Sequence, residues 1–272
     1  MAFLFNEARN FTAYAKDGEI GRVKDMLFDD RTLNMRYVVI DKSRWLPGNK
    51  ILLSPYAIES CDYEKEKIYF DLNQRKIQDA PSLEDHLPVS RQFESQLYHH
   101  YSWIPYWTGA PLSYSWYPYP GHRIKSSNSH PKEKDARRPW GNGDRDDQNL
   151  RSCREICGYR ISSADDEEFG ELSDLIITDD DFLLIDLVVC SRRWLPGGKT
   201  FCLSPLFAAA LDEIGRSVHM ELSREAILSS PPFQWEYYGE PYRKSLAEHY
   251  QKIKNQGPES SGNSQDGRIP VS

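Results

Sequence analysis

The chain has 272 residues, of which 39% are hydrophobic and 28% charged, and its formal net charge is −7. This composition is typical of a soluble globular protein, and the acidic balance argues against binding nucleic acid through a basic face. We expect no membrane span, because no apolar run approaches the roughly 20 residues that cross a bilayer, and no secretory signal. The five cysteines are an odd number, which disfavours a disulfide framework and predicts a cytoplasmic protein.

Residues 1–80 predict a β domain followed by a tail. Short stretches rich in aromatic and β-branched residues alternate with turn residues, and they predict strands at residues 21–30, 35–41, 50–55 and 67–72. Residues 81–110 follow as a helical and aromatic tail, because Phe93, Leu97, His100 and Tyr101 are spaced as on one helix face.

Residues 111–150 are polar, rich in Gly and Pro and without periodicity, which predicts a flexible linker. Residues 151–230 predict a second β domain, with strands at 171–181, 182–190, 199–205 and 217–222. Residues 231–254 predict a second helical tail, and residues 255–272 a disordered C-terminus.

The two β domains are an internal repeat. Trp45 and Trp194 lie 149 positions apart (194 − 45), and ten of the thirty positions from 21 to 50 are identical at this offset. Chance would give about two identities. After the tryptophans the offset becomes 150, as between Leu53 and Leu203. The second copy therefore has one extra residue, which we expect as a bulge or a longer loop.

Five or six short strands within about 75 residues favour a small barrel, because closure removes the edge strands. The predicted fold class is mainly β, with two tandem small β-barrels that are each followed by a short helical tail. Two copies are too few for a solenoid, so we expect each copy to be a self-contained domain.

This combination resembles the PRC-barrel family, which includes the photosynthetic reaction centre H subunit and the C-terminal domain of the ribosome maturation factor. The resemblance rests on the segments GRVKDMLFDD, RYVVID, WLPGNK, LLSPYAI and YFDLNQRKIQDAP of the first copy and on their counterparts in the second. The two copies with their tails are similar to a free-standing bacterial subgroup with two barrels. The resemblance implies a non-enzymatic module that docks on other macromolecules, by analogy of fold.

The repeated Trp-Leu-Pro-Gly stretch with its nearby lysine has two interpretations. A phosphate loop requires a Gly-rich run before Lys-Ser/Thr and a helix behind it. Strand-like sequence follows Lys50 instead, and Pro196 removes an amide donor. We therefore favour the turn of a β-hairpin, in which Pro and Gly set the φ angles. Trp45 and Trp194 would then pack at the mouths of the barrels, with a ligand-facing role as the alternative.

We interpret the acidic run and the cysteine pair as structural features. Nine carboxylates lie between Asp165 and Asp181, but without the Gly-bearing loop of a calcium site. They predict two solvated loops around a strand, with a cation site or an acidic docking face as the alternative. Cys153 and Cys157 lack the spacing of a redox pair or a zinc site.

The remaining polar candidates do not form a catalytic set. His100 and His249 are repeated among tyrosines and predict packed, hydrogen-bonded residues rather than metal ligands. Ser54 and Ser204 precede proline and predict loop residues rather than nucleophiles. We predict no catalytic residue, no cofactor and no metal.

The segment from Tyr98 to Tyr119 holds nine Tyr or Trp residues in 22 positions and no Lys or Arg. Either its first part packs on the barrel, or the segment binds a partner, since Tyr and Trp dominate interface hot spots. Single-stranded nucleic acid is disfavoured, because stacking platforms pair aromatic with basic residues. The candidate interaction residues are Trp45, Trp194, Tyr101, Trp103, Tyr106 and Trp107.

The sequence therefore favours a cytoplasmic, non-enzymatic docking or adaptor protein. Stress response and the assembly of a larger complex, such as an electron-transport or ribonucleoprotein complex, are the settings that fit. We expect a protein partner and no nucleic acid, and a homodimer is an open option. The alternative is a small-ligand or cation sensor that uses the space between the barrels.

Overall fold

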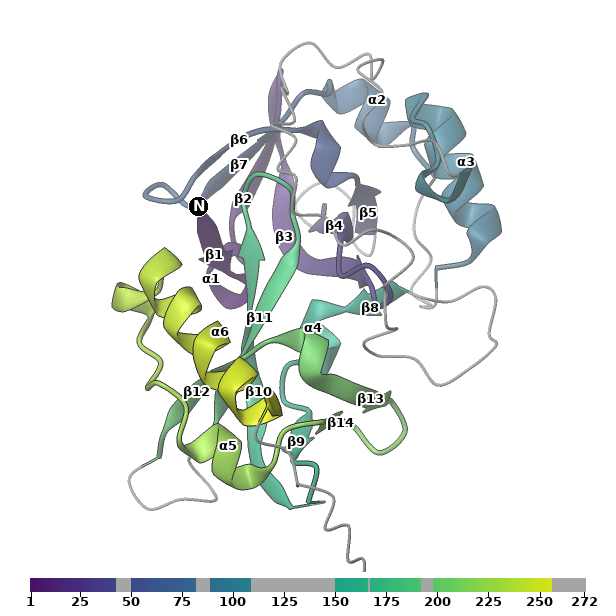
Figure 1. The fold of residues 1–272 in the computed structure, drawn as a ribbon. Helices are drawn as coiled ribbons and strands as arrows, with labels where there is room; N and C mark the ends of the chain where they lie inside the picture. The colour runs from purple at the N-terminus through teal and green to yellow at the C-terminus, as the bar shows by residue number, and fades with distance from the viewer. Residues whose placement is uncertain (43–49, 82–88, 109–149, 166, 192–197, 256–272) are drawn as a thin grey trace, which may run out of the picture.

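The computed structural model describes residues 1–42, 50–81, 89–108, 150–165, 167–191 and 198–255 (Figure 1). These residues form two halves of similar architecture, residues 1–108 (the first half) and residues 150–255 (the second half). Both halves are mainly β, as the sequence predicts. Among the described residues, no helix is long and apolar enough to cross a membrane.

The first half begins with a short strand, β1 (Ala2–Leu4), and a short helix, α1 (Phe5–Ala8). Its remaining strands are β2 (Thr12–Ala15), β3 (Gly18–Asp29), β4 (Met35–Asp41), β5 (Lys50–Leu53), β6 (Ile58–Asp62) and β7 (Lys67–Phe70). The helical elements that follow β5 are η1 (Pro55–Ala57), α2 (Gln74–Gln78), α3 (Arg91–Tyr101) and η2 (Tyr106–Thr108).

The second half repeats this order. It begins with β8 (Leu150–Ser152) and α4 (Cys153–Ile156). Its remaining strands are β9 (Arg160–Ser162), β10 (Glu168–Thr178), β11 (Leu184–Cys190), β12 (Thr200–Leu203), β13 (Ala208–Asp212) and β14 (Ser217–Met220). Its remaining helical elements are η3 (Pro205–Phe207), α5 (Arg224–Leu228), η4 (Trp235–Tyr237) and α6 (Glu240–Asn255).

Each half has one sheet with the same strand order. The orders are β5-β4-β3-β2-β7-β6 and β12-β11-β10-β9-β14-β13, and in each order the fourth and fifth strands are parallel. Within the described ranges, no backbone ladder joins β5 to β6 or β12 to β13, so hydrogen bonds do not close the expected barrels. A 3-10 turn spans this open edge in each half. Ser54 and Ser204 cap these turns through their hydroxyls, which confirms them as loop residues.

The repeated Trp-Leu-Pro-Gly stretches connect antiparallel strands. Residues 43–49 and 192–197 lie outside the described residues, but the ladders on either side begin at Asp41 opposite Lys50 and at Cys190 opposite Thr200. These strands confirm the hairpin prediction, since a strand and not a helix follows Lys50. Both ladders are regular, so the extra residue of the second half lengthens the connection and does not form a bulge.

Two glycines of the repeat lie where neighbouring strands come close together. A Cβ on Gly21, whose φ is 137°, would collide with the carbonyl oxygen of Asp41. A Cβ on Gly170 would lie 2.8 Å from the carbonyl oxygen of Cys190. A side chain at either position would push β3 from β4 or β10 from β11, which explains why both halves keep glycine there.

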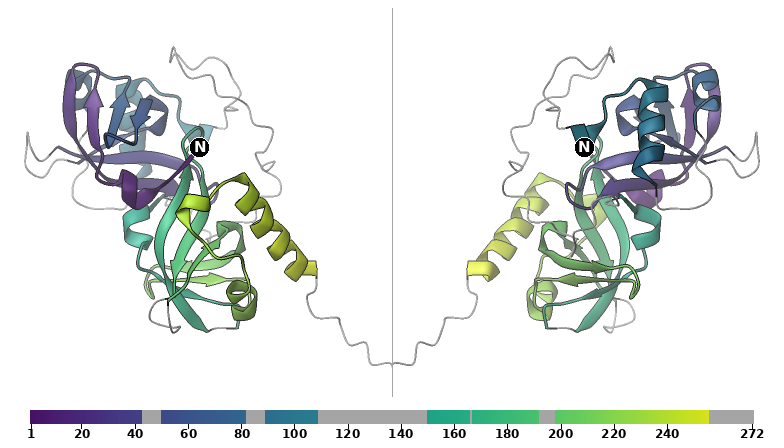
Figure 2. Two further views of the ribbon diagram at one scale, coloured as in Figure 1. Left: turned by 90° about the vertical axis from the view of Figure 1, so that its left-hand side faces the viewer. Right: turned by 90° about the vertical axis from the view of Figure 1, so that its right-hand side faces the viewer.

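The first strand of each half belongs to the sheet of the other half. β1 pairs with β10, and β8 pairs with β3 (Figure 2). The two registers are equivalent, because Leu4 lies opposite Ile176, Ser152 lies opposite Leu27, and 27 + 149 = 176. The helices that follow, α1 and α4, pack against β10 and β3. The structure thus differs from the expectation of self-contained domains, because each half completes the other.

A buried aspartate and its half-buried equivalent hold the exchanged segments in place. Asp25 accepts hydrogen bonds from the Ser152 hydroxyl (2.5 Å) and from the Arg154 amide (2.9 Å). Its equivalent Asp174 accepts a hydrogen bond from the main-chain N–H of Asn6 (3.0 Å). Burial raises the pKa of both carboxyls. The same residue type therefore fixes the exchange on both sides.

The turns between β3 and β4 and between β10 and β11 meet each other. The Met35 amide donates to the Phe182 carbonyl (2.8 Å), and the Leu184 amide donates to the Leu33 carbonyl (2.9 Å). These bonds are equivalent at the offset of 149, and they flank an isolated antiparallel bridge between residues 34 and 183. The halves are therefore related by an approximate two-fold axis that passes between these turns.

The tail helices pack on their own halves and lie far apart (Figure 2). The His100 Nε2 donates to the carbonyl of Lys76 (2.7 Å), and His249 Nε2 donates to the carbonyl of Ala226 (2.9 Å). Because 76 + 150 = 226, the two histidines make the same contact with α2 and α5. This confirms the prediction of packed, hydrogen-bonded histidines.

A buried acid joins each tail to its sheet. The acid belongs to the tail helix in the first half and to the sheet in the second half. In the first half, Glu94 of α3 is 2% exposed and accepts hydrogen bonds from the hydroxyls of Tyr37 (2.7 Å) and Tyr106 (2.9 Å). Burial raises the pKa of Glu94. The second-half equivalents of Tyr37 and Glu94 are Asp186 and Arg243, so here the sheet carries the acid.

Asp186 is 4% exposed and accepts a hydrogen bond from the Tyr238 hydroxyl (2.6 Å). The Arg243 guanidinium lies 3.6 Å from the same carboxyl. Burial raises the pKa of Asp186 to about 6, against the opposing effects of Tyr238 and Arg243. Each half thus keeps an acid and a phenol at this place, with the acid on a different element.

Candidate docking surface

The predicted aromatic residues at the end of α3 pack within the first half. Tyr101 and Trp103 are 2% and 6% exposed, and their rings stack at 4.3 Å. Tyr106 and Trp107 are half-buried, and the Arg91 guanidinium lies 4.4 Å from the centre of the Trp107 ring. The structure places these four side chains as the packing interpretation expects. Residues 109–119 of the tract and both loop tryptophans lie outside the described residues.

The acidic run is spread along β10 and its flanks. Asp165 accepts a hydrogen bond from the Arg224 amide (3.0 Å), and Glu168 pairs with Arg160 (2.6 Å). The five cysteines are free. In the part of the chain that the structure describes, no three or more His, Cys, Asp or Glu side chains are placed to hold a metal ion.

An aromatic pair on the outer face of the first half was not singled out from the sequence. Tyr14 of β2 and Tyr69 of β7 lie opposite each other in the parallel ladder. Their rings stack with centres 5.4 Å apart and planes inclined by 27°. The Lys67 ammonium lies 5.0 Å from the centre of the Tyr14 ring, within range of a cation–π contact. Because side chains alternate along strands, the neighbouring Ala13 faces the core while the rings face outward.

An open groove of about 410 Å³ lies beside this pair. Its lining consists of Tyr14, Ala15, Lys16, Gly18, Glu59, Tyr69 and Phe70. Lys16 forms an ion pair with Asp71, and Glu59 is exposed where β6 shifts register against β7. The groove therefore combines an aromatic floor with charged groups of both signs at its rim. Protein interfaces combine an aromatic centre with a polar rim in the same way.

The second half has no aromatic pair at the equivalent place. Ser162 of β9 and His219 of β14 occupy it, also opposite each other in a parallel ladder. The Ser162 hydroxyl and His219 Nδ1 lie 2.7 Å apart. The fold therefore does not require Tyr14 and Tyr69. The pair could have been found from the sequence by comparing the two copies at positions where side chains face outward.

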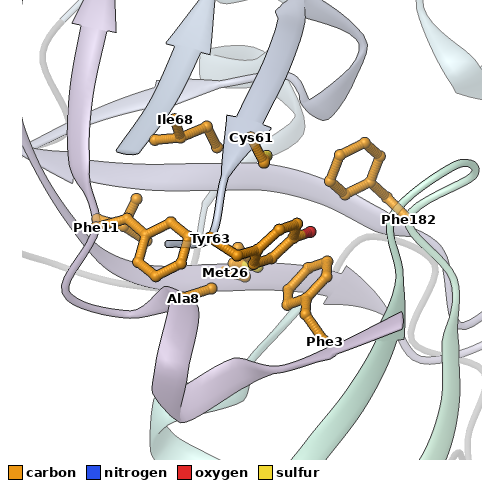
Figure 3. A pocket seen from close by; sticks show the side chains of 9 residues that line it. Phe3, Ala8, Phe11, Met26, Cys61, Tyr63, Ile68 and Phe182 are labelled. Atoms are coloured by element: carbon orange, nitrogen blue, oxygen red, sulfur yellow. The ribbon is translucent and has the colours of Figure 1, made fainter. Parts of the chain in front are cut away.

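A small gap between the halves is lined by apolar side chains (Figure 3). Its volume is about 10 Å³, which is room for about one water molecule. Phe3 of β1 lies between Tyr63 of the first half and Phe182 of the second half, with ring centres 5.9 Å from Tyr63 and 6.4 Å from Phe182. Burial raises the pKa of the Cys61 thiol in this wall to about 11. This gap is too small for a ligand larger than about one water molecule, and the sensor alternative stays a prediction.

Residues 1–75 match the family model of the PRC-barrel domain. This range contains β1 to β7, and therefore every strand that the first half contributes. Residues 1–75 form a PRC-barrel domain. A search of curated proteins finds no match for the chain.

The PRC-barrel domain contains Tyr14, Tyr69 and the whole lining of the groove. The match ends before α3, so the aromatic residues of the tail lie outside it. It also does not extend to the second half, although the second half has the same strand order. The candidate surface is thus a feature of the recognised PRC-barrel domain itself.

Proposed function

We propose that this chain is a non-enzymatic docking or adaptor protein, whose PRC-barrel domain binds a protein partner through Tyr14, Tyr69 and the adjacent groove. The observation that carries the proposal is the outward-facing aromatic pair, which the equivalent strands of the second half lack. A tyrosine offers a large apolar face and a polar tip at a small entropic cost, which makes it effective in interfaces. The family match supports an interaction role in general.

In this proposal the second half is a diverged PRC-barrel that completes the sheet of the first half and stabilises it. The shared strand order and the reciprocal pairing of β1 and β8 support this view. The setting we propose is a cytoplasmic one, in stress response or in the assembly of a larger complex. Its support is the resemblance to PRC-barrel modules that dock on macromolecules.

The chain itself offers a substitution set that the fold should accept. In the double variant Tyr14→Ser and Tyr69→His, the first half takes the residues that the second half has at the equivalent positions. Loss of the cross-strand pair should cost about 1 kcal/mol or less. The matched control is Tyr237→Ser, which removes a tyrosine that is 75% exposed in the second half.

The experiment is affinity capture from an extract of the source cells, followed by titration of the purified partner. We expect the wild type and the Tyr237→Ser variant to retain the same partner with the same affinity. The double variant should bind it at least about 10-fold more weakly, as expected for loss of a hot spot. Equal binding by the folded double variant would show that the partner uses another surface.

A further inference from the structure

The sheet of the second half ends in an edge strand with an open outer side. Within the described residues, β13 pairs with β14 alone, and the strand order has no neighbour on its other side. The sequence of the strand is AAALD, so it has one charged side chain. Figure 1 shows β13 at the outside of the second half, beside its turn to β14. Such an edge offers main-chain N–H and C=O groups to another strand.

The equivalent edge of the first half carries more charge. At the offset of 150, Ala209 corresponds to Glu59, which is exposed on β6. In the turn that follows each strand, Ile214 corresponds to Glu64. Charged side chains are a common protection of edge strands against pairing with another chain. The edge of the second half lacks this protection at both positions.

Two exposed apolar side chains flank β13 symmetrically. Leu206 of η3 is 63% exposed, and Ile214 of the turn to β14 is 98% exposed. Each is four positions from Ala210, the central residue of the strand (210 − 206 and 214 − 210). If two such strands pair antiparallel about Ala210, residue 206 of one copy is aligned with residue 214 of the other. The edge is therefore complementary to itself.

We propose that the β13 edge joins two copies of this chain into a symmetric dimer, in which the two strands pair antiparallel about Ala210. The charges fit this occupant, because Asp212 is then aligned with Ala208 and the two Asp212 carboxylates lie at opposite ends of the pair. The next acid, Glu213, forms an ion pair with Arg151 of its own chain. The surface belongs to the second half and is independent of the docking groove of the PRC-barrel domain.

The size of this contact predicts a weak dimer. Each copy contributes five strand residues and two exposed apolar side chains. Such a contact lies near the lower limit of about 1,000 Å² of buried surface for a specific protein interface. We therefore expect a dissociation constant of the order of 0.1 mM. The fraction of chains in dimers should then rise from about a tenth at about 5 µM to about three quarters at about 0.5 mM.

Sedimentation equilibrium of the full-length chain over this concentration range tests the association. The double variant Ala209→Glu and Ile214→Glu gives the second half the residues that the first half has at both positions. The control is Tyr237→Ser, which removes an exposed side chain of the second half outside β13 and its two ends. We expect the control to associate as the wild type does. The double variant should associate at least about 10-fold more weakly, because it places charge on the edge and removes an apolar contact.

Disulfide formation tests the register of the two strands. Pairing about Ala210 places the two copies of this residue directly opposite each other, with Cα atoms about 4.5–5.5 Å apart, which a disulfide can bridge. The variant Ala210→Cys is compared with Ser60→Cys, its equivalent on the charged edge of the first half. The wild type is the control for the five native cysteines. With oxidised glutathione at equal protein concentration, Ala210→Cys should cross-link between chains at least about 10-fold faster.

Three results would each contradict the proposal. A wild type that remains monomeric at about 0.5 mM overturns the dimer. Undiminished association of the folded double variant would place the contact on another surface. Equal rates of cross-linking for Ala210→Cys and Ser60→Cys would overturn the pairing about Ala210. If the double variant does not fold, the comparison of the two cysteine variants still decides, because neither changes a charge of the edge.

Discussion

Substitution of Asp186 should change how the stability of the protein depends on pH. Asp186 is 4% exposed between β11 and the second tail, and burial raises its pKa from 3.8 to about 6. Since the folded-state pKa lies above the unfolded-state pKa, folding favours the protonated carboxyl. The stabilisation is fully present below about pH 4 and is lost as the pH rises through about 6.

The difference of about two pKa units corresponds to about 3 kcal/mol, at 1.36 kcal/mol for each unit. The Asp186→Asn variant cannot ionise, and its side-chain oxygen can still accept the hydrogen bond from Tyr238. The unfolding free energy of the wild type should therefore fall by about 3 kcal/mol relative to the variant between about pH 3.5 and about pH 7.5.

The assay is urea unfolding of both proteins at a series of pH values and constant ionic strength. Asp62→Asn serves as the control of opposite sign, because the hydrogen bond from Lys65 lowers the pKa of the Asp62 carboxyl. The wild type should gain stability relative to that variant as the pH rises. A pH-independent difference between the wild type and Asp186→Asn would refute the reasoning. A gain in stability of the wild type relative to Asp186→Asn as the pH rises would show that Tyr238 and Arg243 outweigh burial.

Three further substitutions test the packing of the halves and tails. Gly21→Ala should lower the unfolding free energy by more than about 2 kcal/mol in urea titrations, because its Cβ meets the carbonyl oxygen of Asp41. Asp25→Ala should cost about 2–3 kcal/mol and speed amide hydrogen exchange in α4, since two donors of the exchanged segment lose their acceptor. His249→Ala should cost about 1 kcal/mol and speed exchange in α6 while α3 stays unchanged, because only the second tail loses its bond to α5.

The internal offset predicted the shared architecture well, for a physical reason. Identical and apolar residues recur at 149 positions because both sheets need the same inward faces and the same close approach at Gly21 and Gly170. The exchange of β1 and β8 could not be predicted in this way. A three-residue strand has the same local pattern whether it joins its own sheet or another one, and β1 and β8 share no sequence that marks their partner.

The candidate surface was hidden for a related reason. The sequence drew attention to the dense aromatic tract around Tyr101 and Trp103, and aromatic density alone does not distinguish a core from an interface. Tyr14 and Tyr69 are 55 positions apart (69 − 14), and only the parallel pairing of β2 with β7 brings their rings together. The pair stands out when the copies are aligned, because the second half has Ser162 and His219 at these positions.

The opposite placement of the buried acids in the two halves determines whether a tail could be exchanged between them. A chain in which α3 was grafted onto the second sheet would bring Glu94 against Asp186, and two carboxyls would compete for one proton. The reverse graft would leave Arg243 facing Tyr37 with no acid between them. The sheet residue and the helix residue of each half are therefore matched to each other in charge. Each tail has thereby become specific for its own sheet, and the two halves of this protein are no longer interchangeable.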